Sequence, residues 1–206
     1  MEIVKVDSIG EAWLQACDAI MAEGADGADG DEKMKEIMHL LLEIQNPKES
    51  DKIIDAKGDR KMLEWMNSNF TEQKLVPELS NSMSYGTRLF NYNGKNQVQW
   101  VIDKLRKKLE TKAATIPMLM PNDDKGYIPC VSLLDFKVRG GKLTLTVFCR
   151  SIDFGEKAYA NMVALARLQA MVAKEVGAGI GPMVMHVASA HIYEKDFESV
   201  KSVLKD

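Results

Sequence analysis

The sequence predicts an α+β fold in which a mixed, twisted β-sheet is covered by helices. Three observations support this class. The chain opens with the alternating stretch "MEIVKV", which predicts a short strand, and continues with apolar residues at helical spacing as far as Gly24. Residues 127–151 alternate with period two on either side of "RGG", which is typical of a β-hairpin. The stretch "DFGEKAYANMVALARLQAMVAKEVG" predicts the longest helix, and "PMVMHVASAHIY" after it predicts another strand.

Apolar periodicity predicts further helices. They are "DEKMKEIMHLLLEIQNP", which ends near Pro47, "KMLEWMNSNF", "NQVQWVIDKLRKKLET" and the C-terminal "EKDFESVKSVLKD". The preceding "ADGADGDE" has the composition of a calcium loop, but no Glu stands at the twelfth position from Asp26 or Asp29, so we expect a solvated turn. His39 has no ligand partners at matching spacing and is expected to be packed. We expect no metal.

Composition restricts the class of function. The 206 residues are 46% hydrophobic, enough for a substantial core, and we expect one domain over residues 1–206. The formal net charge of −3 gives no general attraction to nucleic acid or to a membrane, so a small-molecule partner is expected. The three cysteines are an odd number in a chain too long to need disulfides, which indicates a reducing cytoplasm. Since no apolar run suits a signal peptide or a membrane span, we expect a soluble, cytoplasmic protein.

Cys130 is the candidate nucleophile, because the predicted hairpin brings polar groups to it. If "RGG" is a three-residue loop, Cys130 lies opposite Arg150, whereas a two-residue loop places Ser151 opposite, and a bulge would change the faces. A neighbouring Arg favours the reactive thiolate, and its planar fork can also grip a phosphate. The alternative is that Cys130 packs as a small hydrophobe. The hairpin pattern alone does not favour one over the other.

Other polar residues also have two interpretations. Asn161 falls on the apolar stripe of the long helix, so it either bonds to the backbone or offers a donor and an acceptor to a heterocyclic base. Asp153 is either a helix N-cap or a site residue. His191 and Tyr193 share one face of a strand, where they either hydrogen-bond a sugar hydroxyl or simply line the sheet.

Taken together, "IPC", then "RSIDF", then an Asn eight residues after the Asp, then "HIY" resemble the thymidylate synthase family, most closely its short, methanogen-type archaeal branch. The resemblance implies a thymidylate synthase-like fold and synthesis of dTMP from dUMP. Cys130 would attack C6 of the pyrimidine, a covalent step that divides one hard reaction into easier ones. Arg150 and Ser151 would hold the phosphate, with Arg150 also supporting the thiolate. Asp153 would lie near the base and Asn161 would bind its edge.

The resemblance also covers the sugar and an earlier segment. His191 and Tyr193, from "HIY", match the pair on the ribose hydroxyl. Before the motif, "YGTRLFNYNG" resembles the family's Tyr-Gly segment, which adds Tyr85 to the substrate-binding residues. The paired arginines that reach the neighbouring subunit's phosphate correspond to "TKAAT", where Lys112 stands. The family implies a homodimer, and the missing arginine pair leaves a monomer open.

The implied cofactor is a reduced methylene-pterin, either 5,10-methylenetetrahydrofolate or methylenetetrahydromethanopterin. The chain departs from the family on this side, because Glu156 and Lys157 replace a Leu-Gly pair and "SVLKD" replaces an apolar C-terminal tail. Those departures fit a different one-carbon carrier. One alternative function is a pyrimidine nucleotide 5-hydroxymethylase, against which Asn161 argues, since Asp suits cytosine there. The other is a non-catalytic nucleotide-binding protein.

Overall fold

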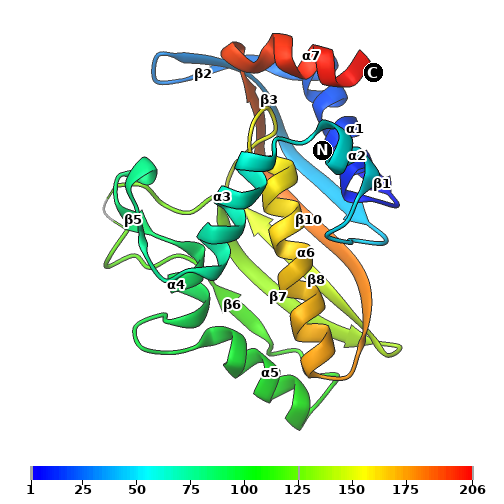
Figure 1. The fold of residues 1–206 in the computed structure, drawn as a ribbon, viewed down its shortest axis with the longest axis vertical. Coiled ribbons are helices and arrows are strands. Elements are labelled where there is room, and N and C mark those ends of the chain that lie inside the picture. The colour runs from blue at the N-terminus through cyan, green and yellow to red at the C-terminus, as the bar shows by residue number, and fades with distance from the viewer. Residues whose placement is uncertain (1, 125, 206) are drawn as a thin grey trace.

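The main sheet contains both parallel and antiparallel pairs. The computed structural model describes residues 2–124 and 126–205, and Figure 1 shows their arrangement. In spatial order the strands are β1 (Glu2–Val6), β3 (Glu32–Ile44), β10 (Gly179–Tyr193), β8 (Lys142–Cys149), β7 (Val131–Arg139) and β6 (Thr115–Pro117). In addition, β2 (Ala25–Asp29) pairs with β3, and β9 (Ile152–Asp153) pairs with β10. Because β10 runs parallel to β8 and antiparallel to β3, the prediction of a mixed sheet is confirmed.

The helices pack over this sheet and around its ends. They are α1 (Ile9–Glu23), α2 (Lys52–Lys57), α3 (Arg60–Thr71), α4 (Tyr85–Phe90), α5 (Gln97–Lys107), α6 (Ala158–Glu175) and α7 (Phe197–Lys205), with short 3-10 turns η1 (Pro77–Leu79) and η2 (Glu194–Asp196). A small hairpin pairs β4 (Leu75–Val76) with β5 (Ser82–Met83). Among the described residues, no helix is both long enough and apolar enough to cross a membrane.

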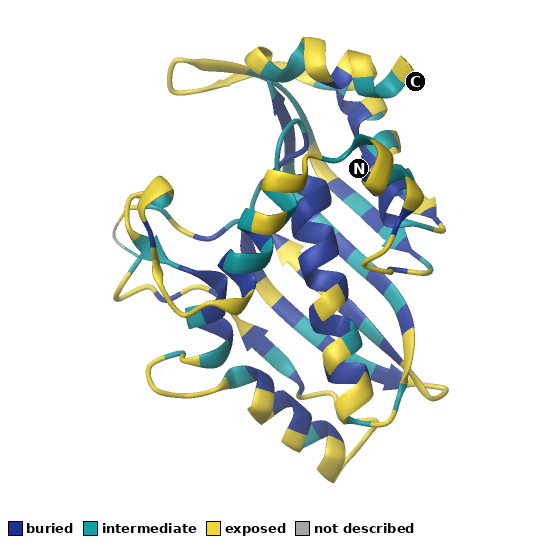
Figure 2. Cartoon of the chain, viewed as in Figure 1, coloured by how far each residue is buried: buried dark blue, intermediate teal, exposed yellow. Residues whose placement is uncertain are grey.

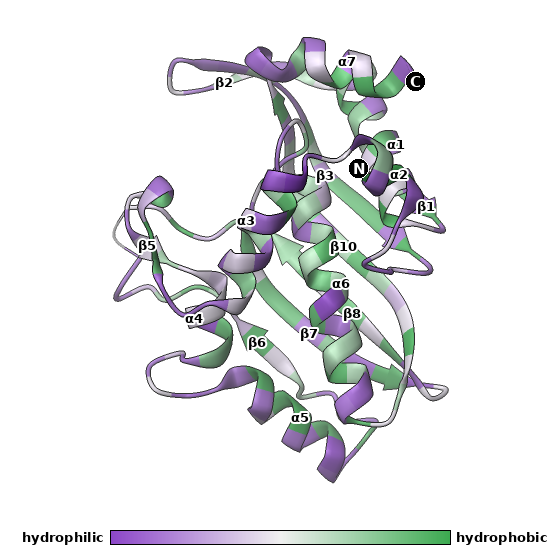
Figure 3. Cartoon of the chain, in the orientation of Figure 1, coloured by the Kyte–Doolittle hydropathy of each residue, from purple (hydrophilic) through white to green (hydrophobic). Residues whose placement is uncertain are grey.

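Helix α6 lies across the sheet and is buried along most of its length (Figure 2). Its sequence is apolar almost all round, which is typical of a helix enclosed by the core. Figure 3 shows the same contrast in hydropathy, with largely apolar strands β7 and β8 beneath α6 and a polar β2 at the edge. Its buried Gln169 donates from Nε2 to the carbonyls of Leu143 and Gly181, both at 2.9 Å. These bonds satisfy backbone acceptors where β10 slips register between Ile180 and Met183.

The strand expected from "MEIVKV" is confirmed over Glu2–Val6, with Met1 outside the described residues, and the helix that follows it is confirmed too. Ser8 and Glu11 form a capping box at the start of α1, and Gly24 ends the helix by donating to Ile20. The helices predicted from "KMLEWMNSNF", "NQVQWVIDKLRKKLET" and the C-terminal segment are also present.

The helix predicted over residues 31–47 is wrong, because this segment forms strand β3 between β1 and β10. Its Met, Glu, Lys and Leu residues favour helix intrinsically, and its apolar positions fit a helical spacing as well as alternation. Pairing on both edges decides for the strand, in which Leu40, Leu42 and Ile44 are buried. The solvated turn expected before it is confined to Gly30 and Asp31, since residues 25–29 form β2.

The prediction for His39 is also wrong, because its side chain is exposed rather than packed. Its backbone has φ of +59°, a left-handed value that interrupts the alternation of β3. The ring Nδ1 lies 3.2 Å from Nε2 of His186 on β10.

The hairpin is confirmed. It has the two-residue loop of one predicted register, but Arg150 lies opposite Cys130 as in the other. Arg139 pairs with Lys142, so the loop has two residues, Gly140 and Gly141, with φ of +55° and +74° as a type I′ turn requires. This loop alone would place Ser151 opposite Cys130. A register shift between Val131 and Leu133 moves the pairing by one residue, and Arg150 N donates to Cys130 O at 2.9 Å.

Candidate active site

A cavity of about 450 Å³ opens where the ends of β7, β8 and β10 meet the start of α6. This volume lies within the range typical of small-molecule sites. Of the nine residues predicted from the sequence, the lining includes eight: Tyr85, Cys130, Arg150, Ser151, Asp153, Asn161, His191 and Tyr193. The ninth, Lys112, is exposed on the segment before β6 and does not line the cavity. The fold therefore brings eight of the predicted residues, which are dispersed along the sequence, to one cavity.

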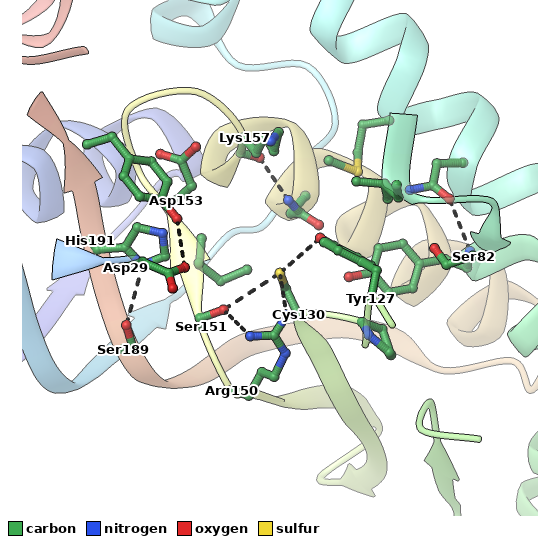
Figure 4. Close-up of a pocket in the computed structure, with 18 of the residues that line it drawn as sticks. Asp29, Ser82, Tyr127, Cys130, Arg150, Ser151, Asp153, Lys157, Ser189 and His191 are labelled. Atoms are coloured by element: carbon green, nitrogen blue, oxygen red, sulfur yellow. Dashed lines mark hydrogen bonds between the residues drawn. The ribbon is translucent and has the colours of Figure 1, made fainter. Parts of the chain in front are cut away.

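The thiol of Cys130 faces three hydrogen-bonding groups in the cavity (Figure 4). Its Sγ lies 3.5 Å from Tyr127 Oη, 3.7 Å from Ser151 Oγ and 4.0 Å from Arg150 Nη2. Cys130 is only partly buried and packs against the edge of the core, whereas Cys17 and Cys149 are fully buried. Of the three cysteines in the chain, Cys130 is thus the one open to a ligand.

Arg150 is held in place but keeps an unpaired donor. Nη2 donates to Ile128 O at 2.8 Å and Nη1 donates to Ser151 Oγ at 3.0 Å. Its Nε is buried and has no partner among the described residues. A guanidinium that is fixed on one side and unpaired on the other suits an anion such as phosphate.

Asn161 combines both interpretations drawn from the sequence. Its Nδ2 donates to Lys157 O at 2.9 Å, so the amide is oriented by the backbone. Its Oδ1 is buried without a partner in the described structure, and the residue lines the cavity. Because the amide nitrogen carries a second hydrogen, Asn161 still offers an acceptor and a donor to a ligand.

Asp153 does not cap the long helix, because α6 begins five residues later, at Ala158, with Lys157 at its cap position. Instead, its Oδ1 accepts from the backbone N–H groups of Gly155 at 3.0 Å and Glu156 at 3.3 Å, which fixes the turn between β9 and α6. Burial raises the pKa of Asp153 to about 6; Lys157 opposes the shift and Asp196 adds to it. The carboxyl group therefore keeps its proton to a higher pH than an exposed aspartate does.

His191 and Tyr193 lie at the end of β10, with ring centroids 4.9 Å apart. Burial lowers the pKa of His191, which favours a neutral imidazole. Its Nδ1 lies 3.4 Å from Ser189 Oγ, and this hydroxyl also hydrogen-bonds Glu36. Tyr193 Oη donates to Asp29 on β2 at 3.4 Å. Both side chains are thus oriented by neighbours and face the cavity.

The cavity has two walls of different chemistry. We call the polar wall the set supplied by residues 130–193: Cys130, Arg150, Ser151, Asp153, Asn161, His191 and Tyr193. We call the apolar wall the set supplied by α3, η1 and β5: Trp65, Met66, Leu79 and Met83. The apolar wall could not be predicted from the sequence, because apolar residues at helical spacing look the same whether they face a core or a cavity.

Tyr127 and Arg88 were also missed. Arg88 is buried, donates to Met118 O at 2.8 Å and forms a two-point ion pair with Asp124 at 2.6 and 3.0 Å, which holds the loop after β6. An aromatic hydroxyl three residues before Cys130 was the available signal for Tyr127, but no periodic pattern marks it.

A half-buried cysteine beside an arginine and two hydroxyl donors, in a cavity of this size, defines a site suited to covalent catalysis on a small anionic molecule. The family model described as thymidylate synthase matches residues 31–206. The chain therefore belongs to the thymidylate synthase family, whose members are methyltransferases that bind dUMP and a folate-type one-carbon carrier.

Similar proteins come from methanogenic archaea. A protein of Methanothermobacter marburgensis named "Putative thymidylate synthase" is 32% identical, over 98% of this chain and 98% of its own length. One of the same name from Methanosarcina mazei is 31% identical over 98% of this chain and 94% of its own. A third, from Methanopyrus kandleri, is 31% identical over 94% of each. The methanogen-type resemblance drawn from the sequence is confirmed.

Proposed function

We propose that this protein makes dTMP from dUMP, with Cys130 as the covalent nucleophile. The observation that carries the proposal is that the Cys130 thiol and the unpaired Oδ1 of Asn161 face the same cavity. A uracil ring between them would present its C6 to the sulfur and its N3–H to the amide oxygen. The second amide hydrogen would then reach O4, so one residue binds both polar atoms of the ring edge.

The remaining polar residues suit the rest of the nucleotide. The unpaired Nε of Arg150, with Ser151, would bind the phosphate, and His191 and Tyr193 would bind the ribose hydroxyl. Asp153 would lie near the base. In the covalent step, Sγ bonds to C6 and the electron pair of the C5–C6 double bond moves toward C5 and O4, where the Asn161 amide stabilises it.

The apolar wall suits the flat, conjugated ring of a reduced methylene-pterin. Trp65 and Met83 would pack against such a ring, and Asn69 is fixed near it because its Oδ1 accepts from Tyr85 N at 3.1 Å. When bound, the carrier would supply the one-carbon unit that C5 receives, together with the reduction to a methyl group. Either tetrahydrofolate or tetrahydromethanopterin carries the needed methylene group.

We further propose that the protein acts in the cytoplasm as a homodimer. Three unpaired cysteines suit a reducing compartment. On the face of the sheet opposite α6, the paired side chains of Leu133 and Phe148 are 37% and 38% exposed, which would suit contact with a second copy. Exposed Lys112 lies outside the cavity of its own chain, so any phosphate role would need a second subunit. Light scattering of the purified protein tests the homodimer, which a monomer at micromolar concentration would contradict.

Release of tritium from dUMP labelled at C5 tests the catalytic proposal. We expect tritium release in the presence of a methylene-pterin, with dTMP as the product by chromatography and mass spectrometry. A 5-hydroxymethyl product would instead identify the pyrimidine nucleotide hydroxymethylase. Binding of dUMP without tritium release, with both tetrahydrofolate and tetrahydromethanopterin forms supplied, would identify a non-catalytic nucleotide-binding protein.

A further inference from the structure

The phenol of Tyr127 makes the shortest of the three contacts to the candidate nucleophile. Its oxygen lies 3.5 Å from Cys130 Sγ, compared with 3.7 Å for Ser151 Oγ and 4.0 Å for Arg150 Nη2. Figure 4 shows Tyr127 approaching the sulfur from the side opposite Ser151. The sulfur therefore lies between donors rather than beside one.

Arg150 also fixes the segment that carries Tyr127. Its Nη2 donates at 2.8 Å to the carbonyl of Ile128, the residue after Tyr127, and Pro129 follows and restricts the backbone. The phenol thus approaches Cys130 from a segment restrained on its C-terminal side. This matters because a hydrogen bond to a thiolate is strong only when the donor is held in place.

Tyr127 is able to donate a hydrogen bond to Cys130 whenever the sulfur is ionised. Burial raises the pKa of Tyr127 above its usual range, and the neighbouring Cys130 raises it further, so the phenol keeps its proton at neutral pH. Arg150 opposes this shift without reversing it. A protonated phenol beside a thiolate has one hydrogen bond to give, and the sulfur is within reach.

During the proposed reaction Arg150 has other partners besides the thiolate. It already donates to Ile128 and Ser151, and in the proposed function it also faces the phosphate of dUMP. A phosphate dianion close to the guanidinium offsets its positive charge at the moment when the thiolate must be present. A neutral donor that does not contact the phosphate is unaffected by that binding.

We propose that Tyr127 is a further catalytic residue, whose phenol donates a hydrogen bond to the Cys130 thiolate and keeps it ionised when Arg150 is occupied by the substrate phosphate. This role rests on the proposed function, in which Cys130 is the nucleophile. As the sulfur bonds to C6 it loses its negative charge. The hydrogen bond from Tyr127 therefore acts by raising the fraction of Cys130 present as thiolate and not by stabilising the adduct.

The rate of Cys130 alkylation by iodoacetamide, measured against pH in the free protein, tests the contact. In Tyr127→Phe we expect the midpoint of the profile to move up by about one pH unit, because a hydrogen bond to the charged form is lost. The plateau at high pH should rise about threefold, since a more basic thiolate is a better nucleophile. Below the midpoint the rate should fall about threefold. A purely structural role for the phenol predicts neither movement of the midpoint nor the rise in the plateau.

Two further variants sharpen the test. Incorporation of 3-fluorotyrosine at position 127 keeps the ring and strengthens the donor, so the midpoint should move down. Tyr193→Phe removes a phenol of the same cavity that bonds Asp29 rather than the thiol, and its alkylation profile should match wild type. Cys130→Ala gives the background from Cys17 and Cys149. Unchanged midpoints in both position-127 variants would overturn the proposal.

The alkylation result is independent of turnover. If Tyr127→Phe shifts the profile but wild type releases no tritium from dUMP, the contact stands and the proposed function fails. If wild type releases tritium and the profile does not move, the function stands and the role of Tyr127 fails. With dUMP bound, we expect the loss of kcat in Tyr127→Phe to exceed the change in KM, because the hydrogen bond acts on the nucleophile and not on the nucleotide.

Discussion

The two walls of the cavity have opposite effects on the fold. The polar wall buries Arg150 Nε and Asn161 Oδ1 without partners in the described structure, and an unsatisfied buried polar atom costs about 1–3 kcal/mol. It also holds Asp153 where burial disfavours the charged carboxylate. The apolar wall removes Trp65 and Met66 from water, which stabilises the fold. Binding capacity therefore lies in the groups that the fold leaves unsatisfied, whereas the apolar wall supplies shape and stability.

The largest effect is expected at Cys130. Cys130→Ala should abolish turnover, because the alanine cannot form the bond to C6, while the melting temperature and the dUMP dissociation constant stay close to wild type. Turnover is measured by tritium release and affinity by calorimetry. Residual turnover well above background would show that Cys130 is not the covalent nucleophile.

Asp153 tests the claim that the polar wall destabilises the fold. Burial raises the pKa of Asp153 from 3.8 to about 6, so between these pH values the folded protein holds a proton that the unfolded chain has released. The stability contributed by this group therefore falls as the pH rises through that window, and the penalty is complete above pH 6. Asp153→Asn keeps the acceptor and removes the penalty, so the mutant should gain up to about 3 kcal/mol relative to wild type at pH 8.

Denaturant unfolding of both proteins at pH 4.5 and pH 8 measures this difference. The gain should be small at pH 4.5 and largest at pH 8. A gain that is equal at the two pH values would show that burial does not disfavour the carboxylate.

Arg150 is expected to bind the phosphate through its planar fork. Arg150→Lys keeps the charge but loses the fork, so dUMP affinity should weaken by about one to two decades, equivalent to about 1.5–3 kcal/mol. The alkylation rate of Cys130 at neutral pH should change little in Arg150→Lys and fall clearly in Arg150→Ala. Arg139→Ala, at the last residue of β7 and outside the cavity, is the control. Wild-type affinity and alkylation in both position-150 variants would show that Arg150 serves neither purpose.

Asn161 is expected to determine which pyrimidine binds. Asn161→Asp loses the donor that O4 of uracil needs and gains an acceptor for the amine of cytosine, so the ratio of dUMP to dCMP affinity should fall about tenfold or more. Calorimetry with the two nucleotides gives this ratio. An unchanged ratio would show that Asn161 does not select the base and serves only as a structural amide bonded to Lys157.

The smallest effect is expected on the apolar wall. Trp65→Ala should raise the KM of the methylene-pterin about three- to tenfold and leave dUMP affinity unchanged, because aromatic packing contributes shape rather than charge. Trp100→Ala on α5, which is 48% exposed and outside the cavity, is the matched control. An equal loss of dUMP affinity in Trp65→Ala would show that the two walls do not bind separate molecules.

The sequence predicted the polar wall better than the apolar wall, for a physical reason. Asn161 and Cys130 stand out because each is polar or reactive at a position where periodicity predicts an apolar residue. The hairpin then relates Cys130 to Arg150 within one register step. Trp65 and Leu79 carry no such contrast, and their place in the cavity depends on how α3 and η1 pack, which is not a local property of the chain.

Segment 31–47 illustrates the same limit for the fold. Its residues favour a helix locally, and its identity as β3 follows from pairing with residues about 150 positions away on β10. His39, with φ of +59°, breaks the alternation that would have identified the strand. Tyr127 was not predicted for a similar reason, because its position beside Cys130 depends on a contact distant in sequence, the hydrogen bond from Arg150 to Ile128.

Mass spectrometry of the protein incubated with 5-fluoro-dUMP and a methylene-pterin tests the central claim most directly. Because fluorine at C5 cannot leave as a proton does, the adduct between Sγ and C6 should accumulate. We expect an intact mass increased by the nucleotide and the carrier, with the modification on the peptide that contains Cys130, and no increase in Cys130→Ala. An adduct on another residue, or turnover of dUMP to dTMP with no adduct from the fluorinated nucleotide, would contradict the account.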